Sequence, residues 1–143
     1  MRIVLDTSCV VAALRSPTGA SAELIRLAAR RRIALLGSLS LALQYLDVCA
    51  RPDVLRGTNI ALDDAVRFAN EVVALLQPVE IRFRWRPAAN DPGDDHVIET
   101  ALNGGADAIA TFNLRDFEDA SKRFGLRVVT PGDILRGLEK FDG

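Results

Sequence analysis

The chain has 143 residues, which is enough to bury one hydrophobic core, and we expect a single domain over residues 1–143. Hydrophobic residues make up 49% and charged residues 26% of the sequence, a balance that excludes a disordered chain. The net charge of −1 excludes a general basic field, so contact with nucleic acid must depend on a local patch or on metal ions. The sequence shows neither a signal peptide nor an apolar run of about 20 residues, so we expect a cytoplasmic protein and no membrane contact.

The first predicted element is a strand at Ile3, Val4 and Leu5, a short run of branched apolar residues suited to burial on both faces. Asp6 ends this run, and a helix-like apolar stretch begins shortly after it. In a parallel sheet, ligands bind at the carboxyl ends of the strands. The Asp6 carboxylate is therefore either a helix N-cap or the first member of an acidic site.

Strand and helix patterns then alternate to the end of the chain. Short apolar runs predict further strands at 33–36, 78–81, 108–110 and 127–129. Helical spacing and capping residues predict helices at about 21–31, 38–50, 59–76 and 92–103, and one that begins near 131. This alternation is typical of the α/β class, with a central parallel sheet of about four or five strands covered by helices on both sides. Cys9 and Cys49 lie in apolar helical stretches and are expected to be buried free thiols.

Three acidic clusters fall where a predicted strand ends or a helix begins. Asp6 ends the first strand, Asp94 and Asp95 lie in the first turn of a helix, and Asn113 and Asp116 follow another strand. These positions converge on one edge of a parallel sheet, where oxygen ligands would suit a hard cation such as Mg²⁺ or Mn²⁺. The alternative is that the acids only stabilise helix N-termini through the helix dipole.

Helical phase predicts that Asp94 is the inward acid of its pair. It lies four residues before Ile98 and seven before Ala101, on the expected buried stripe, and Asp95 lies one residue round from that line.

Four segments of the chain resemble the PIN domain when they are taken in order. They read IVLDTSCVVAALRSPTGAS, LDVCARP, DPGDDHVIETALNGGADAIATFNLRDF and VVTPGDIL. The resemblance is greatest to the branch that contains VapC-like toxins of toxin–antitoxin systems. It implies a three-layer α/β/α domain, a metal-dependent nuclease that hydrolyses RNA with one or two Mg²⁺ or Mn²⁺ ions, an antitoxin protein as partner, and a homodimer.

The resemblance also implies roles for individual residues. Asp6 matches the first acid of the family pattern, Asp94 the third and Asp116 the fourth, and these three are the expected metal ligands and catalytic residues. The supporting residues that it implies are Thr7, Ser8, Gln44, Asp95, Thr111 and Asn113.

The second acid is where this chain departs from the family pattern. Gln44 stands where relatives of this branch usually carry a glutamate, and it offers one neutral oxygen without the charge. Asp47, one helical turn further on, could replace the missing acid, but we expect it to face solvent. The departure leaves a second hypothesis open, a catalytically weakened PIN-fold binding or regulatory protein. A flavodoxin-like binding domain is a third, and the lack of a phosphate-binding glycine loop argues against it.

Other candidate residues are better interpreted as surface or structural positions than as part of a site. His96 is the only histidine, so a histidine pair or a Ser-His triad is poorly supported, and we expect a surface position. Trp85 stands among Arg82, Arg84 and Arg86, a stretch that would suit single-stranded RNA, although an exposed loop with Trp85 buried is the better interpretation. The helices at about 20–31 and 39–50 are the candidate surfaces for antitoxin or dimer contact.

Overall fold

The computed structural model of the protein describes residues 1–84 and 92–142. Its sheet has five parallel strands, which are β1 (Arg2–Leu5), β2 (Ala34–Gly37), β3 (Gln77–Pro78), β4 (Ala108–Ala110) and β5 (Val128–Val129). The strand order is β3-β2-β1-β4-β5, so β1 lies at the centre between β2 and β4. The predicted α/β class with a parallel sheet of four or five strands is therefore confirmed.

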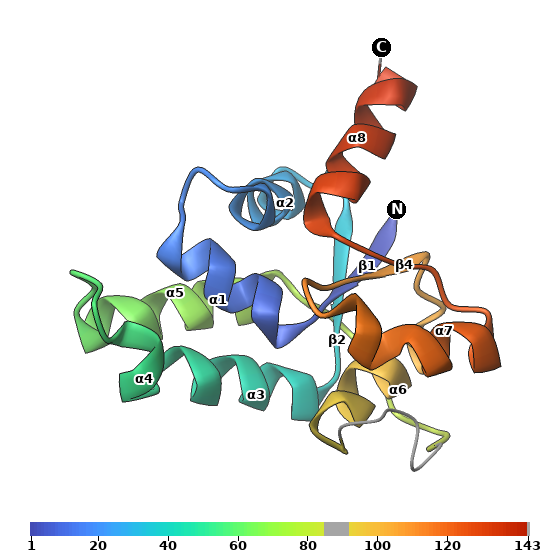
Figure 1. Cartoon of the computed structure of the whole chain (residues 1–143), viewed down its shortest axis with the longest axis horizontal. Coiled ribbons are helices and arrows are strands. Elements are labelled where there is room, and N and C mark those ends of the chain that lie inside the picture. Colours follow the sequence, from blue (N-terminus) through green and yellow to red (C-terminus); the bar gives the residue numbers. More distant parts are fainter. Residues whose placement is uncertain (85–91, 143) are drawn as a thin grey trace.

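Helices cover both faces of this sheet. They are α1 (Thr7–Arg15), α2 (Ala20–Ala29), α3 (Leu39–Cys49), α4 (Pro52–Leu55), α5 (Leu62–Leu75), α6 (Asp95–Gly104), α7 (Glu118–Phe124) and α8 (Pro131–Asp142), with 3₁₀ turns η1 (Pro92–Asp94) and η2 (Leu114–Phe117). Parallel crossovers are right-handed, so the helices that lead toward β3 and those that lead toward β5 fall on opposite faces. Figure 1 shows α1, α3, α4 and α5 on one side of the strands and α6 and α7 on the other.

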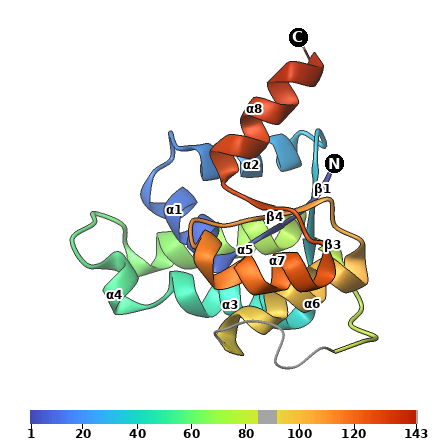
Figure 2. The ribbon, with the colours of Figure 1, turned by 45° about the vertical axis from the view of Figure 1, so that its right-hand side comes forward.

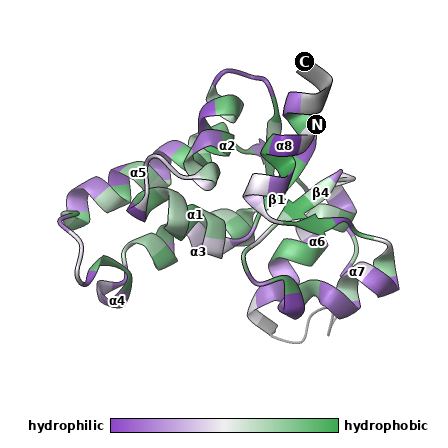
Figure 3. Cartoon of the chain, turned by 45° about the horizontal axis from the view of Figure 1, so that its top comes forward, coloured by the Kyte–Doolittle hydropathy of each residue, from purple (hydrophilic) through white to green (hydrophobic). Residues whose placement is uncertain are grey.

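The core is centred on β1. Ile3, Val4 and Leu5 are at most 1% exposed, because helices pack on both faces of this strand and leave no solvent side. Burying each such side chain stabilises the fold by about 1.5–3 kcal/mol. Figure 3 shows the apolar colouring concentrated on the strands and on the adjoining part of α6. Cys9 and Cys49 are buried free thiols in this core, as predicted.

Two helices were not predicted from the sequence, and one strand was misplaced. The one-turn α4 is too short to show a period, and α7 buries only Ala120, so neither has an apolar stripe. The strand predicted at 78–81 is β3, which ends at Pro78. The predicted burial of Trp85 lies outside the described residues. So does Asp91, which from its place directly before Pro92 is the candidate N-cap of the helix predicted at about 92–103.

The C-terminal helix α8 packs its beginning against α2 and then projects away from the sheet (Figure 2). Its predicted capped start is confirmed. The Asp133 backbone N–H donates to the Thr130 hydroxyl at 3.2 Å, and the Thr130 N–H donates to the Asp133 carboxylate at 3.3 Å. The Thr130 hydrogen bonds, together with Arg136, lower the pKa of Asp133. No helix within residues 1–84 and 92–142 is long and apolar enough to cross a membrane.

Candidate functional site

The site lies where the chain changes direction across the sheet. From β1 the chain moves to β2 on one side, whereas β4, on the other side of β1, leads to β5. The gap between the carboxyl ends of β1 and β4 is thus the topological switch point, where open α/β sheets bind ligands. The two strand ends are joined by a hydrogen bond from the Asp6 N–H to the Ala110 carbonyl, at 2.9 Å.

Asp6 occupies this switch point with its carboxylate buried. Its backbone has the extended conformation of an N-cap residue, but its side chain makes no capping hydrogen bond to α1. Instead, its Oδ2 accepts hydrogen bonds from the Ser8 hydroxyl at 2.7 Å and from the Thr111 hydroxyl at 2.8 Å. Its Oδ1 has only a 3.5 Å contact with the Thr7 hydroxyl. The Asp6 side chain therefore does not cap α1, and of its two oxygens Oδ1 makes the longer contact.

The two hydroxyl groups also tie Asp6 to the loop after β4. The Ser8 oxygen accepts a hydrogen bond from the Phe112 N–H at 3.3 Å, and the Thr111 oxygen accepts one from the Asn113 N–H at 2.9 Å. Thr111 itself is completely buried. The carboxylate and the loop thus orient each other, which supports the positioning roles that the family resemblance implies for Ser8 and Thr111.

Buried groups beneath Asp6 fix the end of β1. The Tyr45 hydroxyl, on α3, donates a hydrogen bond to the Leu5 carbonyl, and the Cys9 thiol donates to the Ala110 carbonyl at 3.2 Å. Burial raises the pKa of Cys9 to about 12, and the nearby Asp6 carboxylate contributes to the rise. Burial also raises the pKa of Tyr45 well above its ordinary value. Both groups therefore stay protonated and act as hydrogen-bond donors.

The acids at the start of α6 lie differently from the prediction. Asp95 is only 4% exposed, whereas Asp94 is half-buried, so the prediction that Asp94 is the inward acid was wrong. The reason is that residues Pro92–Asp94 form a 3₁₀ turn and the α-helix begins only at Asp95. A 3₁₀ turn has three residues per turn, so the α-helical period cannot be extended back through it.

Sequence reasoning missed Glu99, a second buried acid on α6. It is 2% exposed and lies four residues after Asp95, so both carboxylates project from the same face of the helix. α6 packs against β1, β2 and β4, close to the switch point. An acid between Ile98 and Thr100, at i+4 from another acid, is the signal by which it could have been found.

The Gln44 side chain contacts the turn that precedes the same helix. Its Nε2 donates a hydrogen bond to the Gly93 carbonyl at 3.2 Å, which joins α3 to η1. A glutamate at this position could not donate that hydrogen bond. Asp47 faces solvent, as expected, and pairs with Arg51 at 2.6 Å. The structure therefore offers no replacement acid at Asp47.

Asp116 lies in η2 after β4, Asn113 comes directly before this turn, and both residues are exposed. The Asp116 N–H donates a hydrogen bond to the Asn113 carbonyl at 3.0 Å. Within residues 1–84 and 92–142, no three His, Cys, Asp or Glu side chains form a metal-binding group. The donor chemistry still suits Mg²⁺ or Mn²⁺, because such ions are usually held by one or two carboxylates together with water and phosphate. Asp6 and the acids at the start of α6 would be the residues to hold one.

The fold and the site together define a parallel α/β domain with a buried carboxylate at its switch point. A family model described as PIN domain matches residues 2–115. This match spans most of the 143 residues, so the chain belongs to the PIN-domain family and has a nuclease fold. No curated protein matched the sequence.

Proposed function

We propose that this protein is a metal-dependent endoribonuclease that hydrolyses RNA phosphodiester bonds. The observation that carries the proposal is the buried Asp6 carboxylate at the switch point, held through one oxygen by Ser8 and Thr111. Membership of a family with a nuclease fold supports the same reaction class. A bound Mg²⁺ or Mn²⁺ ion would supply an activated water and stabilise the charge that develops on the leaving oxygen.

Some residues of the chain would bind the metal ion, and others would orient those ligands. Asp6 would present Oδ1 to the ion, while the hydroxyl groups of Ser8 and Thr111 hold its other oxygen in place. Asp95 or Asp94, at the start of α6, would supply the second carboxylate. Asp116, in its exposed turn, would complete the acidic set when RNA binds. Hydrogen bonds from neighbouring groups to a ligating carboxylate are a usual means by which a protein orients a metal ligand.

We propose further that the nuclease is the toxin of a toxin–antitoxin pair and works as a homodimer. The support is an apolar exposed face on α3, where Leu39 is 76% and Leu43 is 56% exposed. Two such side chains one helical turn apart form a surface that another protein chain could cover. Light scattering at micromolar concentration tests the dimer, and a monomeric mass would contradict it.

RNA cleavage in the presence of Mn²⁺ tests the catalytic proposal directly. Asp6→Asn should abolish cleavage, because it removes the buried carboxylate charge at the switch point. Asp94→Asn and Asp95→Asn, compared with each other, should show which acid at the start of α6 supplies the second carboxylate, because only that variant should lose cleavage. Asp64→Asn is the matched control, since Asp64 is an exposed acid on α5 that pairs only with Arg67, and it should cleave like the wild type. Cleavage that survives Asp6→Asn would refute the proposal.

A second function, a PIN-fold binding or regulatory protein without nuclease activity, is favoured by one observation. Gln44 uses its side chain as a structural donor to Gly93 rather than offering a charged ligand. A wild-type protein that binds RNA but never cleaves it with Mn²⁺ or Mg²⁺, while Gln44→Glu does cleave, would establish this second function instead.

A further inference from the structure

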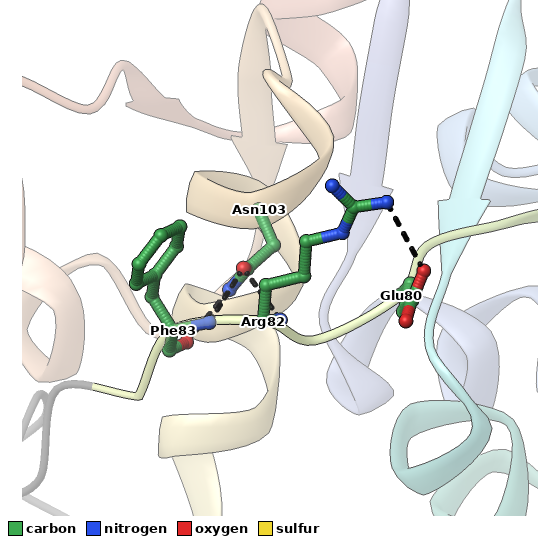
Figure 4. Close-up of polar contacts among 4 residues, drawn as sticks. All are labelled: Glu80, Arg82, Phe83 and Asn103. Atoms are coloured by element: carbon green, nitrogen blue, oxygen red, sulfur yellow. Dashed lines mark hydrogen bonds and ion pairs between the residues drawn. The ribbon is translucent and has the colours of Figure 1, made fainter.

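One side chain on α6 holds a short backbone segment that leads away from β3. The Asn103 side-chain oxygen accepts hydrogen bonds from the N–H groups of Arg82 and Phe83, both at 3.0 Å (Figure 4). Its amide nitrogen donates to the carbonyl of Phe83 at 2.9 Å and to that of Glu99 at 2.8 Å. Both amide hydrogens and the carbonyl oxygen are therefore used. Three hydrogen bonds with one side chain therefore hold the backbone of this segment, although it belongs to no strand.

This fixed segment presents an aromatic ring and a cation to solvent. Phe83 is 66% exposed, and the Arg82 side chain is 73% exposed. Figure 4 shows the Phe83 ring and the Arg82 guanidinium extending from the segment in different directions. A single exposed apolar residue is ordinary on a protein surface. Two hydrogen bonds with Asn103 hold the Phe83 backbone and a third holds Arg82, so the exposed ring and the exposed arginine have fixed backbone positions.

The charge next to the ring is available to an anion. Arg82 pairs with Glu80 at 3.3 Å, and both side chains are more than 70% exposed. Such exposed pairs contribute only about 0–1 kcal/mol, so a phosphate can replace Glu80 with little loss. Beside the pair lies a groove of about 460 Å³ that includes Arg2 and Asn103 in its lining.

The segment lies at the opposite end of α6 from the acidic site. Asn103 lies eight residues after Asp95 on the same helix, which corresponds to about 12 Å along the helix axis. Asp95 and Glu99 lie on the turns that lead from the segment back to the site. The Arg2 guanidinium donates a hydrogen bond to the Gly104 carbonyl and so joins the end of α6 to the beginning of β1. A single strand that contacts both Phe83 and the switch point must therefore run the length of α6.

We propose that Phe83 is a stacking platform for one base of single-stranded RNA, and that Arg82 contacts a phosphate of the same strand. The proposal rests on the proposed function, because this RNA is the substrate of the nuclease. Aromatic stacking accepts any base, so the platform positions the strand without selecting its sequence. It requires unpaired bases, so duplex RNA should not use it.

The test is binding of a short RNA that carries 2-aminopurine, whose fluorescence falls when the base stacks. Binding is measured to the full-length chain in EDTA, so that cleavage does not interfere. Phe83→Ala should weaken binding by about 5- to 140-fold and remove the quenching, whereas Phe83→Tyr should retain both. Asn103→Ala should weaken binding with Phe83 still present. Leu62→Ala is the control, because it removes an apolar side chain that is 54% exposed on α5, and it should bind like the wild type.

The outcomes separate this inference from the proposed function. Unchanged RNA affinity and quenching in Phe83→Ala would overturn the platform, even if the same variant cleaves RNA with Mn²⁺. Equal loss of affinity for duplex and single-stranded RNA would also overturn it. If Phe83→Ala keeps its RNA affinity but loses a co-purifying protein, the surface belongs to a protein partner and the inference is wrong. A wild type that quenches 2-aminopurine through Phe83 but never cleaves RNA would refute the nuclease and leave the platform standing.

Discussion

The hydrogen bond from Thr111 to Asp6 should contribute more to stability than an equivalent bond between neutral groups. Thr111→Val keeps the shape of the side chain but removes the hydroxyl that donates to Asp6 Oδ2 at 2.8 Å. Hydrogen bonds to charged groups are worth about 1.5–3 kcal/mol, and the Asn113 N–H would lose its acceptor as well. We therefore expect the free energy of unfolding to fall by about 2–3 kcal/mol.

The chain provides a matched control in Thr100. Both threonines are completely buried, and each hydroxyl has two hydrogen-bond partners. Thr100 is bonded only to neutral groups, the Ser38 hydroxyl at 2.8 Å and the His96 carbonyl at 2.6 Å. Thr100→Val should therefore cost about 0.5–1.5 kcal/mol, less than Thr111→Val.

Urea unfolding at neutral pH measures the free energy of unfolding of both variants. A double-mutant cycle with Asp6→Asn isolates the contribution of the Asp6 charge to the hydrogen bond. In the Asp6→Asn background the acceptor is neutral, so Thr111→Val should cost no more than Thr100→Val does in the wild type. If Thr111→Val and Thr100→Val are equally destabilising in the wild type, then the Asp6 carboxylate does not strengthen the bond. Thr111 would then not anchor Asp6 through the charge of its carboxylate.

Three further predictions follow from other groups around the site. Tyr45→Phe should lower the free energy of unfolding by about 1–3 kcal/mol in urea, because the Leu5 carbonyl loses a buried donor. Burial raises the pKa of Cys9 to about 12 and that of Cys49 to about 11, above their ordinary value of 9.0. As the pH rises, the thiols ionise in the unfolded chain before they ionise in the folded one. The free energy of unfolding should therefore be greatest below pH 9 and fall above it by up to about 1.4 kcal/mol per pH unit for each thiol. A variant with both cysteines replaced by alanine should show a smaller decrease. Gln44→Glu should lose about 0.5–1.5 kcal/mol in the absence of metal, because its carboxylate faces the Gly93 carbonyl, and added Mn²⁺ should restore more stability to this variant than to the wild type.

Much of the fold followed from local patterns because those patterns have strong physical causes. Ile3, Val4 and Leu5 read as a strand buried on both faces, and all three are buried. The capped start of α8 was readable because Thr130 and Asp133 have the spacing of reciprocal caps. The helix α7 could not be predicted from the sequence, because it is rich in charged residues, buries only Ala120 and is held by contact with η2.

The site was predicted less completely because its geometry depends on contacts between distant segments. Asp6 and Thr111 are 105 residues apart, and only the pairing of β1 with β4 brings them into hydrogen-bond contact. Asp94 was wrongly predicted as the inward acid because residues Pro92–Asp94 form a 3₁₀ turn, and nothing in their sequence predicts that turn. Glu99 was missed because an acid within an apolar stripe reads as an interruption of the buried face. Asp116 as a metal ligand stays a prediction.

The position of Gln44 changes how the missing acid should be understood. α6 already carries two buried carboxylates, Asp95 and Glu99, on the face that packs toward the sheet, and Asp6 is buried at the end of β1. A glutamate at position 44 would add a further negative charge at the start of α6, which already carries Asp94 and Asp95. Gln44 adds no charge and donates a hydrogen bond that holds η1 against α3. The glutamine is therefore a structural link at the start of α6, and its presence is compatible with a site that holds its metal through fewer carboxylates.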